Sequence, residues 1–406
     1  MKLGSRWSVV CVFGTGALWL LSVGLVVGQA PNRPTPGMVQ PTKPRPPETE
    51  QNQMRSETAF INIQTLKGIP ADEFMGTMGI FSAATGLNCF DCHVDTNTPE
   101  GFAIDTPRKQ IARRMATMMQ DINKQYFGGR QVVTCFTCHR GSNHPQATSS
   151  IVTLYSPVVS EELDVVIPPA PAGTPTAVQI LDKYLAAIGG AQRAATVTSI
   201  AAKGTYTGFG PENFPRTFEL YAKAPNQKMS AIRDPESGDT NTVFDGMRGW
   251  ISQPFKNIDV MSLHGAEIDS YRADAELTFP SQIKTSLAGL RSSQDYIDGK
   301  SLFSVQGTKG MAIVTMYFDQ ETGLMTRLVR STPSPVGRIV VRTDIAGYKE
   351  VNGVKIPSQW TSSWFDGRSN FEITDIQVNV PSDAARFAKP GPPKPYPAAA
   401  AGGRGR

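Results

Sequence analysis

Apolar residues along the chain follow several different patterns, and each pattern predicts a different kind of segment. Residues 7–27 form an uncharged apolar run that follows Lys2 and Arg6. Small residues come directly after the run, so residues 1–30 are expected to be a signal peptide. The run is also long enough to span a bilayer, and an uncleaved membrane anchor is the alternative. In both cases we expect the rest of the chain to be exported to the periplasm.

A helical period begins near residue 70. Pro70 suits a first helical position, and Gly86 suits the end of the same helix. Phe74, Met78 and Phe81 lie between them at i, i+4 and i+7. This spacing places the three side chains on one face of the predicted helix.

A second helix is expected from Pro107 to Gly128, with Thr106 as its cap. Its apolar stripe consists of Ile111, Met115, Met118 and Ile122. Each of the two predicted helices is followed by a glycine turn and then by a stretch with two cysteines. The same layout therefore occurs twice in the first half of the chain.

The second half of the chain has a different pattern. A helix is expected over 177–190, and after it apolar and polar residues alternate as in strands. Asn352-Gly353 is typical of a hairpin, and residues 312–330 read as strand, turn and strand. A helical insertion is expected over 265–292. The predicted fold is multidomain, with a small, mainly α domain before a mainly antiparallel β domain whose sheet is curved into a half-barrel (α+β).

Proline-rich segments mark the expected boundaries between these units. The predicted order is a signal peptide or anchor (1–30), a Pro-rich linker (31–55), the α domain (56–148), a linker (149–176), the β-rich domain (177–388) and a disordered tail (389–406).

Charge and common motifs exclude several classes of function. The net charge of +5 is modest for 406 residues, and part of it lies in the leader and the tail. No basic stripe or nucleic-acid-binding motif accompanies it, so nucleic acid is not an expected partner. No Gly-rich phosphate loop or Ser/His/Asp nucleophile motif stands out either. The chemistry is therefore expected from the cysteines and histidines.

Two of the four histidines directly follow a Cys-x-x-Cys pair, in "LNCFDCHV" (87–94) and "VVTCFTCHRG" (132–141). Outside the leader, these stretches contain every cysteine of the chain. In a CxxCH stretch the thiols can form thioethers with haem vinyl groups, and the histidine can bind the iron. A four-cysteine zinc site, a thioredoxin-like pair and two disulfides are the alternatives. None of them requires a histidine after each pair.

Two covalently bound c-type haems are therefore the predicted cofactors, attached through Cys89, Cys92 and His93 and through Cys135, Cys138 and His139. A methionine at the sixth iron position favours electron transfer. The helices offer Met75, Met78, Met115, Met118 and Met119. Met78 shares a face with two phenylalanines. Met115 lies on nearly the same face as Arg108, which is expected to pair with a haem propionate.

The segment "IARRMATMMQDIN…VVTCFTCHRGSNHP" closely resembles the cytochrome c subunit of photosynthetic reaction centres. "DEFMGTMGIFSAATGLNCFDCH" is similar to the preceding haem segment of that family, and the resemblance covers about residues 60–147. It implies that Met115 and Met78 are axial iron ligands and that the protein is an electron carrier, not an enzyme. It also implies a redox partner, either a membrane electron-transfer complex or a soluble cytochrome.

The chain departs from that family in two respects. The family's reaction-centre members carry four haems, whereas this chain has two CxxCH motifs and a large additional C-terminal domain. In that domain "YLAAIGG", "FDGMRGWIS" and "YKEVNGVKIPSQW" resemble lipoprotein-sorting half-barrel proteins, which implies an apolar ligand. A generic β docking domain is the alternative.

Two other functions stay open at this point. The first is a dihaem cytochrome c peroxidase, in which one iron lacks its methionine and reacts with hydrogen peroxide. The second is a lipid-binding or docking protein whose haem domain senses redox state. For every one of these functions, an uncleaved N-terminal segment would anchor the protein to the membrane.

Overall fold

The computed structural model describes residues 54–95, 98–149, 151–155, 166–208, 213–235, 238–254, 258–365 and 367–393. The apolar run at 7–27 lies outside these residues, as do most of the first Pro-rich segment and most of the predicted tail. Among the helices of the described ranges, none combines the length and the apolarity that a membrane crossing requires.

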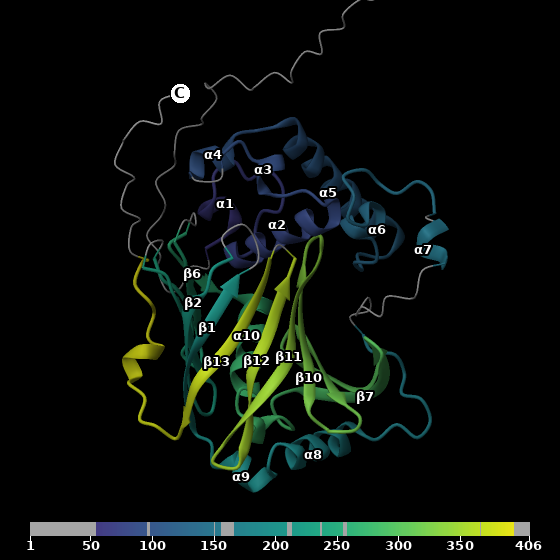
Figure 1. Cartoon of the computed structure of the whole chain (residues 1–406). Coiled ribbons are helices and arrows are strands. Elements are labelled where there is room, and N and C mark those ends of the chain that lie inside the picture. Colours follow the sequence, from purple (N-terminus) through teal and green to yellow (C-terminus); the bar gives the residue numbers. More distant parts are fainter. Residues whose placement is uncertain are drawn as a thin grey trace, which may run out of the picture. The chain divides into compact units, whose positions relative to one another are not determined.

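The described part of residues 54–155 is helical (Figure 1). Its helices are α1 (Ser56–Ala59), α2 (Ala71–Thr85), α3 (Cys89–Cys92), α4 (Pro99–Ala103), α5 (Pro107–Tyr126), α6 (Cys135–His139) and α7 (Ile151–Tyr155). Helix α7 falls within the segment that was expected to be a linker.

Helices α2 and α5 confirm the two helices predicted from periodicity. Asp72 and Glu73 lie in the first turn of α2, where carboxylates interact favourably with the helix dipole. Gly86 ends this helix with a left-handed φ of 67°. Thr106 caps α5, because its hydroxyl oxygen accepts the backbone N–H of Lys109 at 3.2 Å.

The rest of the described chain is dominated by antiparallel strands. They are β1 (Ser199–Gly208), β2 (Arg216–Lys223), β3 (Gln227–Arg233), β4 (Thr240–Phe244), β5 (Gly249–Ser252), β6 (Val260–Leu263), β7 (Ala288–Ile297), β8 (Lys300–Lys309), β9 (Ala312–Asp319), β10 (Met325–Ser334), β11 (Gly337–Val351), β12 (Val354–Trp364) and β13 (Gly367–Val378).

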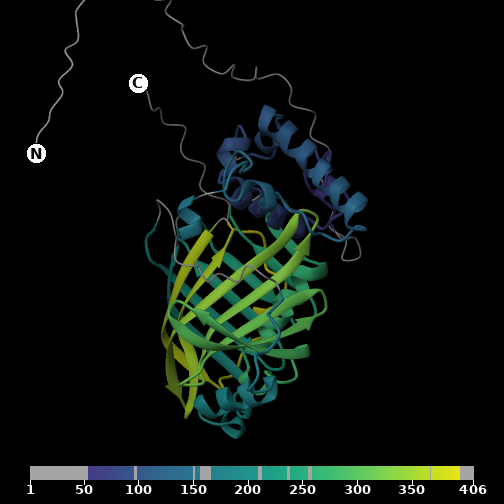
Figure 2. The ribbon, with the colours of Figure 1, turned by 90° about the vertical axis from the view of Figure 1, so that its right-hand side faces the viewer.

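Within the described residues these strands form one sheet in the order β6-β5-β4-β3-β2-β1-β13-β12-β11-β10-β9-β8-β7. Two meanders, β1 to β6 and β7 to β13, are joined where β1 pairs with β13. Figure 2 shows how strongly this sheet curves. The prediction of a large, curved antiparallel sheet is therefore confirmed.

Two hairpins form where the sequence predicts them. Asn352 and Gly353 join β11 to β12 and place Val351 opposite Val354. Their φ values of 52° and 75° are those of a turn that favours Asn and Gly. Strands β9 and β10 are joined across residues 319–323.

Helices α8 (Ala177–Ala187), α9 (Ala191–Ala195) and α10 (Gly265–Leu277) accompany the sheet, with short 3₁₀ turns at Pro280–Gln282 and Ala384–Phe387. Helix α8 confirms the prediction over 177–190. It buries Leu181 and Tyr184 in the main core, together with Val314, Met316 and Phe318 of β9.

The helical insertion expected over 265–292 is wrong in its second half. Helix α10 ends at Leu277, and strand β7 begins at Ala288. Residues of β7 pair with β8, and Ser293 and Ile297 are buried in this pairing. The ladder of hydrogen bonds and the burial favour a strand in a segment whose residues alone do not exclude a helix.

All described residues belong to one compact unit, residues 39–406. In this unit the helical region packs on the hairpin between β10 and β11. Ile80 of α2 and Met119 of α5 share a small core with Val336 of the hairpin. The Gln131 side-chain amide donates to the backbone carbonyl of Ser334 at 2.8 Å.

Candidate functional site

The first CxxCH stretch forms a single capped turn, α3. The Asn88 side chain accepts the backbone N–H of Asp91 at 3.2 Å, and the Asp91 carboxylate accepts the backbone N–H of Asn88 at 2.9 Å. Cys89 and Cys92 are three residues apart, so their side chains lie on the same side of the turn. His93 follows directly as the C-cap.

The second stretch, α6, is built in the same way. Thr134 caps it: its backbone N–H donates to the hydroxyl of Thr137 at 3.0 Å, and its own hydroxyl accepts the N–H of Thr137 at 3.4 Å. The helix ends at His139, and Arg140 turns the chain with a left-handed φ of 51°. Both motifs therefore present two thiols and an imidazole from five consecutive residues.

The end of α2 contacts the turn that follows α6. The backbone N–H of Gly141 donates to the carbonyl of Ala84 at 2.9 Å. A Cβ atom on Gly86 would lie 2.4 Å from the carbonyl oxygen of Gly141. The structure thus brings the helix before the first motif against the turn after the second motif, and this approach requires glycine at position 86.

Both motif histidines use Nδ1 for a hydrogen bond with a backbone carbonyl. His93 Nδ1 lies 3.1 Å from the oxygen of Phe102, and His139 Nδ1 lies 3.0 Å from the oxygen of Ser142. Because a carbonyl oxygen only accepts, the proton is on Nδ1 and the lone pair is on Nε2. Burial, with the charge of Lys109, lowers the pKa of His93 and favours this neutral form. Each imidazole is thereby oriented as a metal ligand through Nε2.

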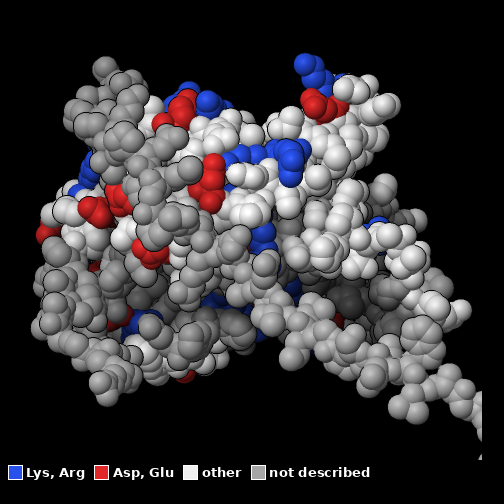
Figure 3. Space-filling model, turned by 90° about the horizontal axis from the view of Figure 1, so that it is seen from above, with Lys and Arg blue, Asp and Glu red and all other residues white. Residues whose placement is uncertain are grey.

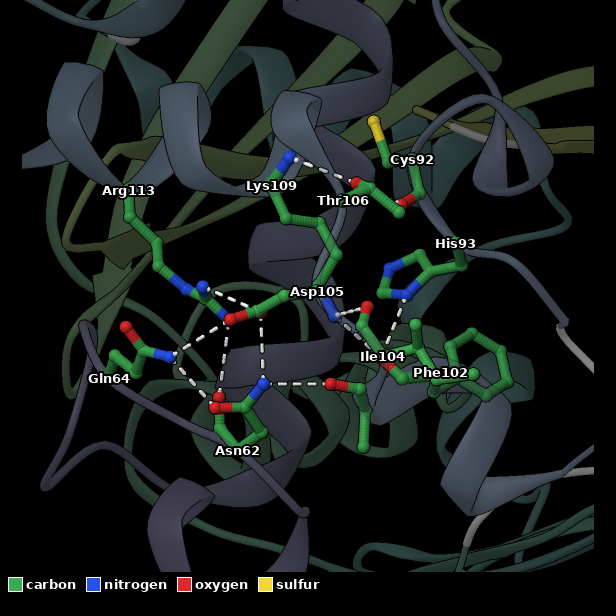
Figure 4. A network of polar contacts seen from close by, with 11 residues as sticks. Asn62, Gln64, Cys92, His93, Phe102, Ile104, Asp105, Thr106, Lys109 and Arg113 are labelled. Atoms are coloured by element: carbon green, nitrogen blue, oxygen red, sulfur yellow. Dashed lines mark hydrogen bonds and ion pairs between the residues drawn. The ribbon is translucent and has the colours of Figure 1, made fainter. Parts of the chain in front are cut away.

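The segment between the first motif and α5 is held by hydrogen bonds to backbone carbonyls (Figure 4). The ammonium group of Lys109 donates to the carbonyls of Phe102 and Ile104, both at 2.8 Å. The hydroxyl of Thr106 donates to the carbonyl of Cys92 at 2.9 Å. Burial lowers the pKa of Lys109 to about 8. The carbonyl that orients His93 is therefore itself fixed by a lysine.

The Asp105 carboxylate connects this segment to α5 through an ion pair and to the N-terminal part of the helical region through a hydrogen bond, as Figure 4 also shows. The Asp105 carboxylate accepts from Arg113 at 2.8 Å and from the side-chain amide of Asn62 at 2.9 Å. Burial raises the pKa of Asp105, but the hydrogen bond and charge of Arg113 outweigh it and hold this pKa below its ordinary value. Asp105 is therefore ionised at neutral pH.

The four thiols are not bridged by disulfides. Cys89 and Cys138 are exposed, whereas Cys92 and Cys135 are half-buried. Burial raises the pKa of Cys92, and it raises the pKa of Cys135 to about 11. A reactive redox pair has a lowered thiol pKa, so the raised pKa values of Cys92 and Cys135 give no support to a thioredoxin-like function. Over the described ranges no three His, Cys, Asp or Glu side chains are grouped as ligands of one metal ion, which counts against a shared zinc site.

Large apolar side chains are exposed around both motifs. Phe90 and Phe136, inside the two CxxC pairs, are 70% and 52% exposed, and Met115 and Met118 on α5 are 37% and 46% exposed. The apolar residues buried in this helical region are few and mostly small: Ala59, Ala71, Ile80, Ala84, Ala116 and Met119. A region of this size normally buries more apolar surface. Unbridged thiols, oriented imidazoles and uncovered apolar side chains together fit attachment of haem, a large planar apolar group.

The predicted axial methionines lie on different helices. Met78 is half-buried on α2, and Met115 is exposed on α5. Phe74, predicted to share the face of Met78, stacks on Phe60 with ring centroids 5.0 Å apart. Arg108, expected to pair with a propionate, donates to the first motif turn.

Arg108 connects α5 to α3. Its guanidinium donates to the backbone carbonyl of Asp91 at 2.7 Å and to the Asp91 carboxylate at 3.3 Å. The arginine therefore positions the first CxxCH turn. Only one terminal nitrogen of the guanidinium makes these contacts, and the side chain is 48% exposed. The pairing of Arg108 with a haem propionate stays a prediction.

A hollow of about 740 Å³ lies beside α5. Its lining combines the apolar Met118, Ile122 and Tyr126 with Arg113 and Arg114. Figure 3 shows that, on the face seen from above, basic and acidic groups are interspersed and much of the surface is uncharged. The lining of this hollow therefore mixes apolar side chains with charged groups of both signs, because Asp121 also belongs to it.

Sequence reasoning missed the groups that orient the histidines. The carbonyls of Phe102 and Ser142 leave no trace in a motif, since every residue has a carbonyl. Lys109 left a signal, because a lysine in the first turn of a helix opposes the helix dipole and so needs another reason to be there. The structure supplies that reason in two carbonyl partners.

Residues 24–161 match the family described as "Photosynthetic reaction centre cytochrome C subunit". The "Photosynthetic reaction center cytochrome c subunit" of Rubrivivax gelatinosus (strain NBRC 100245 / IL144) is 28% identical over 138 residues. This match covers 33% of the present chain and 34% of the relative, so it spans about a third of the relative's length. The resemblance expected for residues 60–147 is confirmed.

Three solved structures are similar to part of this chain. A DUF1329 family protein from Desulfovibrio piger has a TM-score of 0.36 at 12% identity and covers 53% of this chain and 98% of its own. A LolA superfamily protein from Nitrosomonas europaea has a TM-score of 0.36 at 14% identity, and the match covers 53% of this chain and 99% of that protein. An outer membrane lipoprotein-sorting protein domain from Vibrio parahaemolyticus has a TM-score of 0.35 at 10% identity, and the match covers 52% of this chain and 96% of that domain.

Proposed function

We propose that this protein is an exported dihaem c-type cytochrome that carries electrons to or from a redox partner protein. One haem would be held by Cys89, Cys92, His93 and Met78, and the other by Cys135, Cys138, His139 and Met115. The observation that carries the proposal is the pair of motif histidines. Each has its Nδ1 proton donated to a carbonyl and its Nε2 lone pair left for iron, directly beside two unbridged thiols.

The residues of the chain supply attachment, orientation and exclusion of water. The thiols of each motif form the covalent links, and the capped turns α3 and α6 fix their spacing. Phe90 and Phe136 provide apolar surface beside each attachment point. Haem, when bound, supplies a one-electron couple at its iron, and a methionine thioether at the sixth position favours electron transfer over binding of other ligands.

Export of the chain is part of the same proposal. The apolar run at 7–27 after Lys2 and Arg6 is typical of a signal peptide or an anchor. A match to a cytochrome c subunit over residues 24–161 supports a location outside the cytoplasm, where c-type attachment takes place. The apolar ligand expected at the β domain stays a prediction.

The proposal is tested by the mass of the denatured full-length protein, produced in a host that attaches c-type haems. We expect the mass of the polypeptide plus two haems. The double variant Cys89→Ala/Cys92→Ala should lose one haem, and Cys135→Ala/Cys138→Ala should lose the other. A denatured mass equal to that of the polypeptide alone would contradict the proposal.

The ligand assignment is tested separately. Met78→Ala and Met115→Ala should each retain both haems but convert one of them to a high-spin form with a lowered midpoint potential. Met118→Ala, on the same helix as Met115 and similarly exposed, is the matched control and should leave both haems low-spin. A wild-type protein with one five-coordinate high-spin haem and peroxidase turnover would favour the peroxidase instead.

A further inference from the structure

Two carboxyl groups lie at the junction between α2 and α10. Asp72, in the first turn of α2, is only 5% exposed. One of its oxygens accepts the backbone N–H of His264, the residue that precedes α10, at 2.7 Å. Its other oxygen has no hydrogen-bond partner among the described residues. Glu267, in the first turn of α10, is half-buried and accepts the hydroxyl of Thr332.

Other carboxylates of α10 that are shielded from solvent have a cation beside them. Asp274 pairs with Lys228 at 2.7 Å, and Glu276 pairs with Lys309 at 2.6 Å. Neither Asp72 nor Glu267 forms an ion pair within the part of the chain that the structure describes. A buried carboxylate without a cation is costly in its charged form, so this pair of groups favours a bound proton.

The surrounding charges point in the same direction. Burial raises the pKa of Asp72 to about 7, and the charge of Glu267 contributes to the rise. Burial also raises the pKa of Glu267, against the opposing effects of Thr332 and Arg330. The pKa of the neighbouring Glu73 is raised by burial and by Glu267, against the opposing charge of Arg55.

The remaining charged groups are occupied by other partners. The Arg330 guanidinium donates to the carbonyl and hydroxyl of Ser270, both at 3.1 Å, and lies 5.6 Å from the ring of Tyr271. Asp274 is neutralised by Lys228. Glu73, the next residue on α2, is half-buried.

We propose that Asp72 and Glu267 form a proton-binding pair whose occupancy follows the oxidation state of the haem at α2, so that electron transfer by this protein is accompanied by proton uptake. The inference rests on the proposed function. With haem bound, uptake of one electron from the redox partner would be accompanied by the passage of one proton from solvent to a carboxylate oxygen of the pair. Oxidation releases the electron to the partner and the proton to solvent.

The linkage between the carboxyl pair and the haem rests on helix α2, which carries both Asp72 and the proposed iron ligand Met78. Asp72 and Met78 are six residues apart on α2, which is about 9 Å along a helix axis. Asp72 itself is only 5% exposed, so water screens a change of one charge at the haem less strongly at this carboxyl than at an exposed one. Loss of a positive charge favours the protonated carboxyl, and therefore reduction and protonation favour each other.

The first test is the midpoint potential of the full-length haem-loaded protein as a function of pH. We expect the potential of one haem to fall as pH rises through neutrality. Asp72→Asn keeps an acceptor for the His264 N–H but cannot ionise, so it should flatten this response. Asp274→Asn, on α10 but paired with Lys228, is the matched control and should retain it.

The second test detects the proton itself. The reduced-minus-oxidised infrared difference spectrum should show a protonated carboxyl band in the wild type, and the band should be lost in Asp72→Asn and weakened or shifted in Glu267→Gln. Reversible haem transitions with a pH-independent potential would overturn the inference and leave the proposed function intact. A pH-dependent midpoint potential that persists in both Asp72→Asn and Glu267→Gln would also overturn the inference. If no haem transition were observed, the proposed function would fail and the inference with it.

Discussion

Replacing Asn123 by alanine is expected to loosen the segment that leads into the second CxxCH stretch. Asn123 lies on α5 and is 6% exposed. Its amide donates to the carbonyl of Val133 at 2.7 Å, and its carbonyl oxygen accepts the backbone N–H groups of Val132 and Val133 at 3.0 and 2.9 Å. One side chain thus makes three hydrogen bonds to the two residues before Thr134, the cap of α6.

The size of the effect follows from these three hydrogen bonds. Each contributes about 1 kcal/mol net, so local opening of the segment should become easier by about 3 kcal/mol. At about 1.4 kcal/mol per factor of ten, this corresponds to an equilibrium constant for local opening that is about 100-fold larger. Because the segment precedes α6 directly, the position of Cys135 should become less well defined.

Amide hydrogen exchange of the peptide that contains residues 130–138 measures this opening. We expect protection at Val132 and Val133 to be lost in Asn123→Ala, with little change in α2 or the sheet. Gln120→Ala, an exposed position on the same helix, is the matched control and should exchange like the wild type. Unchanged protection in Asn123→Ala would refute the reasoning, since the three hydrogen bonds would then not hold the segment.

Three further variants probe other parts of the structure. Gly86→Ala should destabilise the helical region by more than 2 kcal/mol in urea unfolding, because it combines a left-handed φ with a backbone clash. The control Gly68→Ala, with φ of 81° and open space around it, should cost about 1 kcal/mol. Thr106→Ala should cost about 1 kcal/mol as a lost helix cap, whereas Thr106→Ser should retain most of it. Asp72 binds its proton more tightly in the folded chain, with a pKa raised from 3.8 to about 7. Its contribution to stability is therefore complete below about pH 4 and lost as pH rises to about 7, at about 1.4 kcal/mol per pKa unit. The free energy of unfolding of the wild type should therefore be smaller at pH 8 than at pH 5, and Asp72→Asn should remove this difference. A wild type that is equally stable at both pH values would contradict the prediction.

Elements with local signals were predictable from the sequence. Helices α2 and α5 carry their own start and stop residues, and the hairpin at Asn352-Gly353 is specified by two residues that accept positive φ. The attachment residues of the candidate site were equally local, because thiols and imidazole stand within five consecutive positions. The structure leaves their role as haem ligands a prediction.

Features that depend on distant residues were not predictable. Strand β7 was expected to be partly helical, because its pairing with β8 decides its conformation. The contact of Arg108 with the Asp91 carbonyl was not foreseen, because nothing local indicated that this carbonyl lies within its reach. The pairing of Arg108 with a propionate stays a prediction. Asp72 and Glu267 are separated by nearly half of the chain, and only the fold brings them together.

The central claim is that each CxxCH stretch holds a haem that exchanges one electron. A spectroelectrochemical titration of the full-length haem-loaded protein tests it most directly. The account predicts two one-electron transitions of low-spin c-type haem, of which Cys89→Ala/Cys92→Ala removes one and Cys135→Ala/Cys138→Ala removes the other. A single transition, or two that both survive in either double variant, would contradict it.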